Sequence, residues 1–203
     1  MREYPSIGGA NTGHKGEPCF IFEKYDGSNL RCEWNKKSGW SKFGPRTRRF
    51  DKTDNQFGDA VDLFAAITPD VFERIAHIIK RKNYRKATIF CEYLGDNSFA
   101  GTHFPEDKKR LVLFDVTFNG MLLPPREFLD MFRDAPYRAH CYGTDTYNQN
   151  LINSVKEGKL TSGEGVICKG YKQKGGIWMA KIKTDAYIKR LQEMYKNSWE
   201  DYV

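Results

Sequence analysis

The chain has 203 residues, of which 39% are hydrophobic and 14% aromatic, so it can bury a core and suits one domain better than several. Its 33 Lys and Arg residues exceed its 26 Asp and Glu residues, and the formal charge of +7 favours a polyanionic partner. Its five cysteines form no C-x-x-C pair, and it has no run of 18 apolar residues, which argues against a disulfide framework, a zinc site and a membrane span.

The first half of the chain predicts a flexible start, two strands and a helical region. Residues 1–17 are rich in Gly, Asn and Pro, as flexible segments are. Within residues 19–40, two strands flank a turn at Lys24 as a hairpin-like unit, and a second turn follows at residues 35–39. Apolar residues recur every three or four positions over residues 57–82, where Pro69 predicts a division into two helices.

The second half predicts more strands than helices. Apolar runs at residues 88–94 and 110–118 read as central strands, and a helix follows at residues 126–132. A last strand pair brackets a loop at residues 172–176, and an amphipathic helix runs from residue 185 to about 198. Strands and helices mix without strict alternation, which predicts an α+β fold of antiparallel sheets flanked by helices rather than a doubly wound parallel sheet.

Lys24 is the first candidate catalytic residue. It ends an apolar run and begins the sequence Lys-Tyr-Asp-Gly-Ser-Asn, which places it half out of water. Desolvation and nearby cations free a lysine amine for attack, and Gly27 lets a ligand come close. The pattern predicts a nucleophile, although an ordinary strand and turn facing solvent would look the same.

Three further segments carry polar or aromatic residues beside apolar strands. Residues 41–49 form a basic, glycine-containing turn suited to phosphates, or else a solvated loop. Glu92 stands inside a strand that otherwise reads as core, so it needs a partner such as a ribose hydroxyl, Mg²⁺ or a buried cation. Phe114 could stack on a base or simply belong to the core.

The last two segments combine a carboxylate with paired lysines. Lys181 and Lys183 lie two residues apart, which places both on one face of a strand. Two like charges there are unfavourable unless an anion such as a triphosphate lies between them or both are solvated. Asp26 and Glu164 are the carboxylates that would offset this charge together with Mg²⁺.

Six segments in this order resemble the motifs of the covalent nucleotidyltransferases, the superfamily of ATP-dependent DNA ligases, RNA ligases and mRNA capping guanylyltransferases. They are K-Y-D-G-S-N (24–29), S-K-F-G (41–44), F-C-E-Y-L-G (90–95), L-F-D-V (113–116), E-G-V-I-C-K (164–169) and A-K-I-K (180–183). Asn29, five positions after Lys24, resembles the second type of phage RNA ligase and the trypanosome editing ligases. The resemblance implies a nucleotidyltransferase (ATP-grasp-like ligase) fold.

The resemblance also implies roles for individual residues. Lys24 would become linked to AMP. The expected nucleotide contacts are Glu23 and Asn29 beside the nucleophile, Glu92 on the ribose, Phe114 on the adenine, Glu164 in the lysine network, and Lys181 with Lys183 on the phosphates. Asp26 and Glu164 are the expected metal ligands. The arginine that the family has after the hairpin aligns with Lys42, while Arg46 and Arg48 lie just beyond, so three candidates stay open.

We therefore expect an ATP-dependent RNA ligase that joins 3′-OH and 5′-phosphate ends through a lysyl-AMP intermediate, using Mg²⁺ or Mn²⁺. The alternatives are a minimal ATP-dependent DNA ligase, a GTP-using capping guanylyltransferase and a non-catalytic nucleic-acid-binding relative. The expected partner is a nucleic acid, RNA rather than DNA, without a membrane. We expect a cytoplasmic monomer, in the host cytoplasm if the source is viral. Because the chain ends about 20 residues after Lys183, we expect a single adenylyltransferase domain over residues 1–203, without an OB-fold or helical C-terminal domain.

Overall fold

The computed structural model describes residues 3–10, 13–95, 104 and 106–202, with side chains as far as residue 200. The chain forms two compact units. Unit 1 contains Met1–Pro5, Ser28–Gly95 and Glu106–Arg138, and unit 2 contains Ser6–Gly27 and Ala139–Val203. The single domain expected over the whole chain stays a prediction, because two compact units can belong to one domain.

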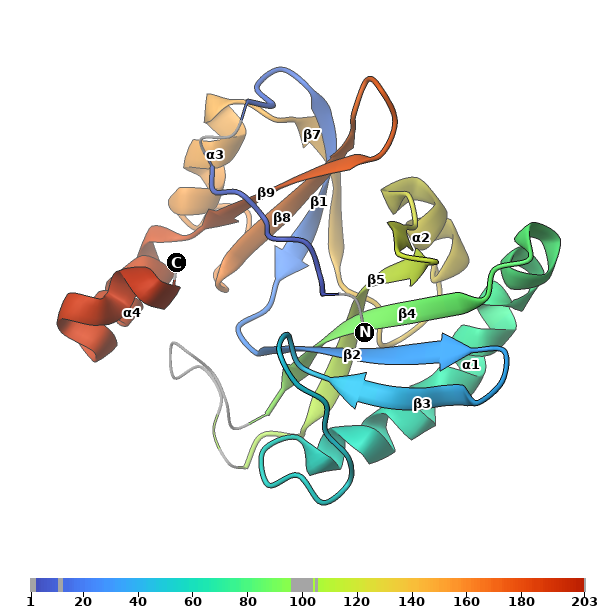
Figure 1. Cartoon of the computed structure of the whole chain (residues 1–203). Coiled ribbons are helices and arrows are strands. Elements are labelled where there is room, and N and C mark those ends of the chain that lie inside the picture. Colours follow the sequence, from blue (N-terminus) through green and yellow to red (C-terminus); the bar gives the residue numbers. More distant parts are fainter. Residues whose placement is uncertain (1–2, 11–12, 96–103, 105, 203) are drawn as a thin grey trace. The chain divides into compact units, whose positions relative to one another are not determined.

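Unit 1 is a five-stranded antiparallel sheet with a long helix along one face (Figure 1). Its strand order is β3-β2-β4-β5-β6, with β2 at Ser28–Asn35, β3 at Gly39–Gly44, β4 at Lys86–Leu94, β5 at Arg110–Phe118 and β6 at Met121–Leu122. The helix is α1 (Gly58–Lys82), and a short helix, α2, covers Pro125–Met131. Residues 30–34 of β2 are all buried: Leu30, Cys32 and Trp34 lie on one face of the strand, and Arg31 and Glu33 lie on the other.

Helix α1 is continuous, so the prediction of two helices divided at Pro69 was wrong. Phe64, Thr68, Val71 and Ile75 recur at three- and four-residue steps, and all are buried. Pro69 is exposed, on the side where a helix can curve and lose one hydrogen bond at modest cost. Burial of the opposite stripe therefore outweighs the roughly 3 kcal/mol that a proline costs inside a helix.

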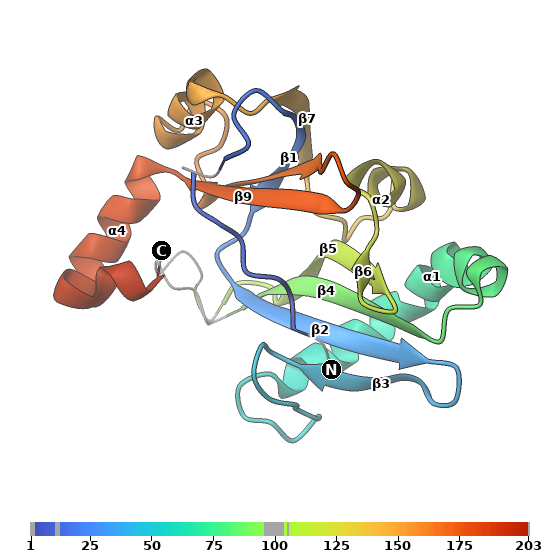
Figure 2. The same ribbon diagram turned by 45° about the horizontal axis from the view of Figure 1, so that its top comes forward.

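Unit 2 is a four-stranded antiparallel sheet of order β7-β1-β8-β9, seen from a second side in Figure 2. The strands are β1 (Pro18–Lys24), β7 (Cys141–Thr146), β8 (Gly165–Tyr171) and β9 (Ile177–Lys183). Helix α3 (Gln149–Lys156) begins where the Asn148 side chain accepts a hydrogen bond from the Leu151 backbone. Helix α4 (Asp185–Tyr195) continues into a 3-10 helix, Lys196–Tyr202.

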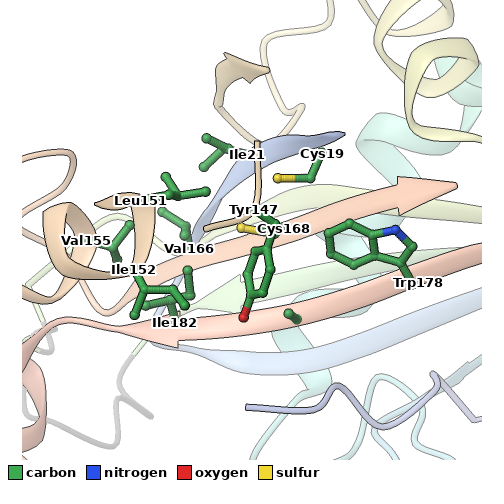
Figure 3. Packing of buried hydrophobic residues seen from close by; sticks show 11 residues of the cluster. Cys19, Ile21, Tyr147, Leu151, Ile152, Val155, Val166, Cys168, Trp178 and Ile182 are labelled. Atoms are coloured by element: carbon green, nitrogen blue, oxygen red, sulfur yellow. The ribbon is translucent and has the colours of Figure 1, made fainter. Parts of the chain in front are cut away.

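The core of unit 2 lies between α3 and one face of this sheet. Figure 3 shows Leu151, Ile152 and Val155 of α3 beside strand residues of the same cluster. The buried members are Cys19, Ile21, Tyr147, Leu151, Ile152, Val155, Val166, Cys168, Trp178, Ala180 and Ile182. Because side chains alternate along a strand, the other face of the sheet presents Lys24, Lys181 and Lys183.

The first two strands do not form the predicted hairpin. β1 pairs with β7 and β8, whereas β2 pairs with β3 and β4, and the boundary between the units falls between Gly27 and Ser28. Each strand is flanked on both sides by strands of its own sheet, so it satisfies its backbone groups there. The second predicted turn is confirmed, because β2 and β3 pair directly across residues 36–38.

Most other predicted elements are present. β5 has the predicted bounds, and α2 begins and ends one residue earlier than expected. Residues 41–44 belong to β3 rather than to a turn, and α4 ends at Tyr195 instead of near residue 198. Strands β6 and β7 and helix α3 were not predicted. The α+β fold with antiparallel sheets is confirmed. In the described part of the chain, no helix has the length and hydrophobicity to cross a membrane.

Candidate active site

Three strands of unit 2 bring two lysines to one carboxylate. Lys24 at the end of β1 lies opposite Gly165 of β8, which lies opposite Lys183 of β9. The Lys24 Nζ is 2.6 Å from the Glu164 Oε1, and the Lys183 Nζ is 3.0 Å from the same oxygen. The Glu164 side chain is only 3% exposed, so water screens these charges weakly. The predicted nucleophile therefore belongs to a buried network of three charges.

Gly165 makes this arrangement feasible. Its φ is +153°, a backbone conformation that side chains rarely adopt. A Cβ at this position would lie 2.0 Å from the Ile182 carbonyl oxygen and 2.8 Å from the Lys183 Cα. Gly165 therefore allows β8 to lie close to β9 at the position where Lys24 and Lys183 flank β8.

Both lysines of β9 are destabilised as ammonium ions. Burial lowers the pKa of Lys181, and the positive charge of Lys24 lowers it further. Burial also lowers the pKa of Lys183, where Glu164 opposes the effect. The Lys183 Nζ lies 4.8 Å from the centre of the Tyr187 ring, which favours the charged form. An anion bound at this face would relieve the repulsion among these cations.

Asp26 belongs to the same unit but contacts α4. It is 6% exposed, and its Oδ1 accepts a hydrogen bond from the Tyr187 hydroxyl at 2.9 Å. Burial, followed by the charges of Glu164 and Asp26, raises the pKa of Tyr187 well above 10, so the phenol remains a donor. Within the described ranges, no cluster of three or more His, Cys, Asp or Glu side chains is placed to hold a metal ion. A cation here would need ligands from a bound molecule as well as from the protein.

Glu23 precedes the nucleophile but points into a different polar group. Its carboxylate accepts hydrogen bonds from the Tyr142 hydroxyl and, at 3.0 Å, from the Thr161 Oγ1. Burial and the hydrogen bond with Glu23 raise the pKa of Tyr142 to about 12. Glu23 therefore connects β1 with β7 and with the segment before β8.

Unit 1 holds the other predicted contacts of the nucleotide. Asn29 of β2 lies directly opposite Glu92 of β4. On β5, Phe114 lies at a register shift, because Asp115 lies opposite Phe90 of β4 while Leu113 lies opposite Cys91. Such bulges re-aim a side chain. The Tyr4 ring centre is 5.1 Å from that of Phe114, and the Tyr4 hydroxyl donates a hydrogen bond to Asp115. The N-terminal segment thus packs beside Phe114.

The three candidates for the phosphate-binding cation differ in their partners. Lys42 lies 3.3 Å from the Glu33 Oε1, and the Arg46 Nε lies 3.8 Å from a Glu3 oxygen. Arg48 is bonded to Asp54 in an exposed pair. Because each of the three cations has a carboxylate partner, all three remain predictions.

Four neighbours of the predicted residues were not found from the sequence. Arg31 is 5% exposed, its Nη2 donates to the Arg46 carbonyl at 3.2 Å, and its buried Nε has no hydrogen-bond partner among the described residues. Its spacing from Asn29 and Glu33, at period two, could have placed it on their face. The other three are Tyr4, Tyr142 and Tyr187. No local pattern singles them out, since each contacts a residue more than 110 positions away.

The predicted site residues thus divide between the units. Unit 2 brings together Lys24, Glu164, Lys181 and Lys183, with Glu23 and Asp26 beside them. Unit 1 carries Asn29, Lys42, Arg46, Glu92 and Phe114.

Solved structures share this fold at low sequence identity. A variant of the Naegleria gruberi RNA ligase with AMP and Mn matches with a TM-score of 0.66 at 13% identity, over 94% of this chain and 58% of that one. A variant of the same ligase with ATP and Mn gives 0.65 and 13%, over 92% and 57%. A putative ATP-dependent DNA ligase from Aquifex aeolicus gives 0.63 and 17%, over 98% and 53%.

The chain therefore spans somewhat more than half the length of the proteins whose structures it matches. No curated protein matches it. A family model described as RNA ligase matches residues 17–183, which include every predicted site residue. Because this match covers most of the sequence, from β1 to the end of β9, the chain belongs to the RNA ligase family.

Proposed function

We propose that the protein is an ATP-dependent RNA ligase that joins a 3′-OH end to a 5′-phosphate end, with Lys24 as its nucleophile. One observation carries the proposal: Lys24 and Lys183 converge on the buried Glu164 in a chain that matches the RNA ligase family. We expect a monomer that acts in the cytoplasm, on RNA rather than DNA.

In the first step, the Lys24 ammonium group passes a proton to water, and the resulting amine attacks the α-phosphorus of ATP. A P–N bond forms, the bond to the bridging oxygen breaks, and pyrophosphate leaves with the electron pair. One difficult condensation is thereby replaced by a series of easier steps, the first of which forms the covalent lysyl-AMP. The ion pair with Glu164 supports this role, because it holds the amine at a fixed place at the end of β1.

The phosphates are expected to bind over the lysine-bearing face of unit 2. Lys181 and Lys183 would supply positive charge that an anion compensates, which fits their lowered pKa values. Mg²⁺ usually takes one or two carboxylates together with substrate phosphates, so Glu164 and Asp26 fit it only in combination with ATP. Such a metal would neutralise charge that builds up on the phosphates. Each carboxylate already has a partner in the protein, because Oε1 of Glu164 contacts Lys24 and Lys183 and Oδ1 of Asp26 accepts the Tyr187 hydroxyl.

Unit 1 is expected to bind the nucleoside. Phe114 would offer its ring to the adenine, and Glu92 would accept a hydrogen bond from a ribose hydroxyl. Asn29 lies opposite Glu92, which supports a shared role in binding the nucleoside. Glu23 directly precedes the nucleophile Lys24 in the sequence. Lys42, Arg46 or Arg48 would contact a phosphate.

The remaining steps use the activated phosphate. An oxygen of the RNA 5′-phosphate attacks the α-phosphorus, the P–N bond breaks, and the adenylylated 5′ end forms. The 3′-OH of the second end then attacks the 5′-phosphorus, and AMP leaves. The net charge of +7 favours RNA binding and predicts a steep dependence on salt concentration.

The test is the intact mass of the protein after incubation with ATP and Mg²⁺. We expect the wild type to gain the mass of AMP and Lys24→Ala to gain nothing. Lys189→Ala is the matched control, because Lys189 is an exposed lysine on α4 and should leave the adduct unchanged. Absence of any adduct on the wild type would overturn the proposal and favour a non-catalytic RNA-binding relative.

Sealing assays with matched RNA and DNA substrates then identify the nucleic acid. Sealing of DNA but not RNA would support the DNA ligase alternative, which the fold shared with the Aquifex protein keeps open. An adduct of GMP from GTP in place of AMP would support a capping-type transferase.

A further inference from the structure

The carboxylate of Glu23 joins three separate segments of unit 2. Its Oε2 accepts a hydrogen bond from the Tyr142 hydroxyl on β7, and its Oε1 accepts one from the Thr161 Oγ1 at 3.0 Å. The Thr161 side chain is in turn an acceptor for the Gly163 backbone N–H at 3.0 Å. Both carboxylate oxygens are therefore engaged inside the unit.

An irregular strand pairing aims Tyr142 at this carboxylate. Ile21 lies opposite Gly143 and Phe22 lies opposite Cys141, so no residue of β1 stands opposite Tyr142. Bulges of this kind commonly re-aim a side chain beside an active site. The backbone next to the bulge is fixed as well, because the Glu23 N–H donates to the His140 carbonyl at 3.0 Å.

Further hydrogen bonds connect Thr161 with Glu164 through Gly163 and Thr184. The Gly163 carbonyl accepts a hydrogen bond from the Thr184 hydroxyl at 2.9 Å, and the Thr184 N–H donates to the Glu164 carbonyl at 2.9 Å. Residues 161–164 are thus held on one side by Glu23 and on the other by Thr184, the residue that caps α4. Lys24 directly follows Glu23, so the two ends of the Lys24–Glu164 ion pair are tied to each other through Glu23 and Thr161.

From this geometry we propose that Glu23 is a positioning residue, with Tyr142 and Thr161 as its partners. It holds the end of β1 against residues 161–164 and so sets the separation of the Lys24 amine from Glu164. The inference rests on the proposed function for its catalytic meaning. It differs from the expectation that Glu23 binds the nucleotide, because its carboxylate acts on the protein rather than on ATP.

The first test measures single-turnover formation of the AMP adduct over a range of ATP concentrations. We expect Thr161→Val, which replaces the hydroxyl with a methyl group of similar size, to lower the maximal rate about tenfold, as expected for a lost hydrogen bond to a charged group. The ATP concentration at half-maximal rate should change less than twofold. Thr161→Ser keeps the hydroxyl and should keep the rate, which a merely structural effect of the substitution would not explain.

A double-mutant cycle checks that Thr161 acts through Glu23. If it does, Thr161→Val should lower the rate little further in a Glu23→Ala background, which has no side-chain acceptor left for the Thr161 hydroxyl. Gly163→Ala perturbs the same place from the backbone, because its Cβ would lie 2.6 Å from the Glu23 Oε1, and it should also slow the reaction. A Thr161→Val variant with the wild-type rate, or with a raised half-maximal ATP concentration and an unchanged maximal rate, would overturn the inference.

A second readout does not depend on the proposed function. Acetylation of Lys24 by acetic anhydride, followed by peptide mass analysis, reports how firmly the amine is held. In Thr161→Val, acetic anhydride should acetylate Lys24 several times faster than in the wild type. In Thr161→Ser, the rate of acetylation should equal that of the wild type. A wild type without an AMP adduct, together with this acceleration, would refute the ligase but support the positioning tie. Equal acetylation in both variants would refute the tie itself.

Discussion

Lys24 and Lys183 occupy the same rung of the unit 2 sheet, on either side of Gly165, and both ammonium groups contact Oε1 of Glu164. A single buried carboxylate thus balances part of two positive charges. Because Lys181 lies on the same face two residues earlier in β9, the face carries more positive than negative charge. Such an excess is unfavourable in the free protein and favourable once an anion binds.

The Gly165→Ala variant should be strongly destabilised. The new Cβ would lie 2.0 Å from the Ile182 carbonyl oxygen, a backbone atom, and the φ of +153° would be strained as well. We expect a loss of at least about 3 kcal/mol in the free energy of unfolding, measured by urea denaturation.

A matched variant separates the two causes of this loss. Gly143 has a φ of +114°, but no atom of the described residues lies within 4 Å of the place that a Cβ would take, so Gly143→Ala tests backbone strain alone. It should lose about 1–3 kcal/mol, less than Gly165→Ala. Equal losses would show that contact with Ile182 contributes nothing.

Binding of ATP should weaken with rising pH below pH 10.5, the usual pKa of a lysine. Burial lowers the pKa of Lys183, so its ammonium form is lost at a lower pH than in an exposed lysine. Calorimetry with a non-cleavable ATP analogue from pH 7 to pH 10.5 measures this decline. Lys183→Arg keeps its charge over that range and should flatten the decline, even if affinity at neutral pH falls.

The control for this titration is Lys189→Arg, an exposed replacement on α4 that should follow the wild type. A decline of the same size in Lys183→Arg would assign the pH dependence to another group, with Lys181 as the next candidate.

Tyr142 should make the stability of the protein sensitive to alkaline pH. Its pKa is raised from 10.0 to about 12 in the folded state, so the folded protein binds more protons than the unfolded chain between these values. The stabilising contribution of Tyr142 is therefore complete below about pH 10 and is lost as the pH rises to about 12. Tyr142→Phe should lack this loss in urea denaturation at a series of pH values.

Tyr171→Phe is the control for an exposed phenol, and its stability should follow that of the wild type over the same range. If the difference between wild type and Tyr142→Phe is constant from pH 9 to pH 12, the Tyr142 hydroxyl does not depend on Glu23 in the way that the hydrogen bond implies.

The sequence predicted the strands best where their patterns were long and apolar. β5 has the predicted bounds because most of its residues are buried, and its side chains are apolar at every position except Arg110, Asp115 and Thr117. β7 was missed because it is largely exposed, with Gly143 and Asp145 in it, so it lacks strand periodicity. The partners of β1 were also wrong, since strand pairing depends on residues far along the chain.

The same limit applies to the candidate site. Lys24, Glu164, Lys181 and Lys183 could be predicted because each lies in a short motif, and the structure places all four in unit 2. The tyrosines that hold Glu23 and Asp26 lie in β7 and α4, at separations of 119 and 161 residues, and no local pattern reveals such contacts.

Pro69→Ala should stabilise the protein without changing its activity. In the continuous α1, residue 69 has no N–H to donate to the Ala65 carbonyl four residues earlier, and its ring is exposed, so few core contacts depend on it. Alanine restores the hydrogen bond but also increases the entropy of the unfolded chain. The expected net gain is about 1–2 kcal/mol in the free energy of unfolding.

Ala66→Gly, at an exposed position of the same helix, is the control. It should lose about 1 kcal/mol in the free energy of unfolding, which shows how strongly α1 responds to a change in helix propensity. A Pro69→Ala variant no more stable than the wild type would mean that α1 is curved at this residue so that the restored N–H does not reach Ala65.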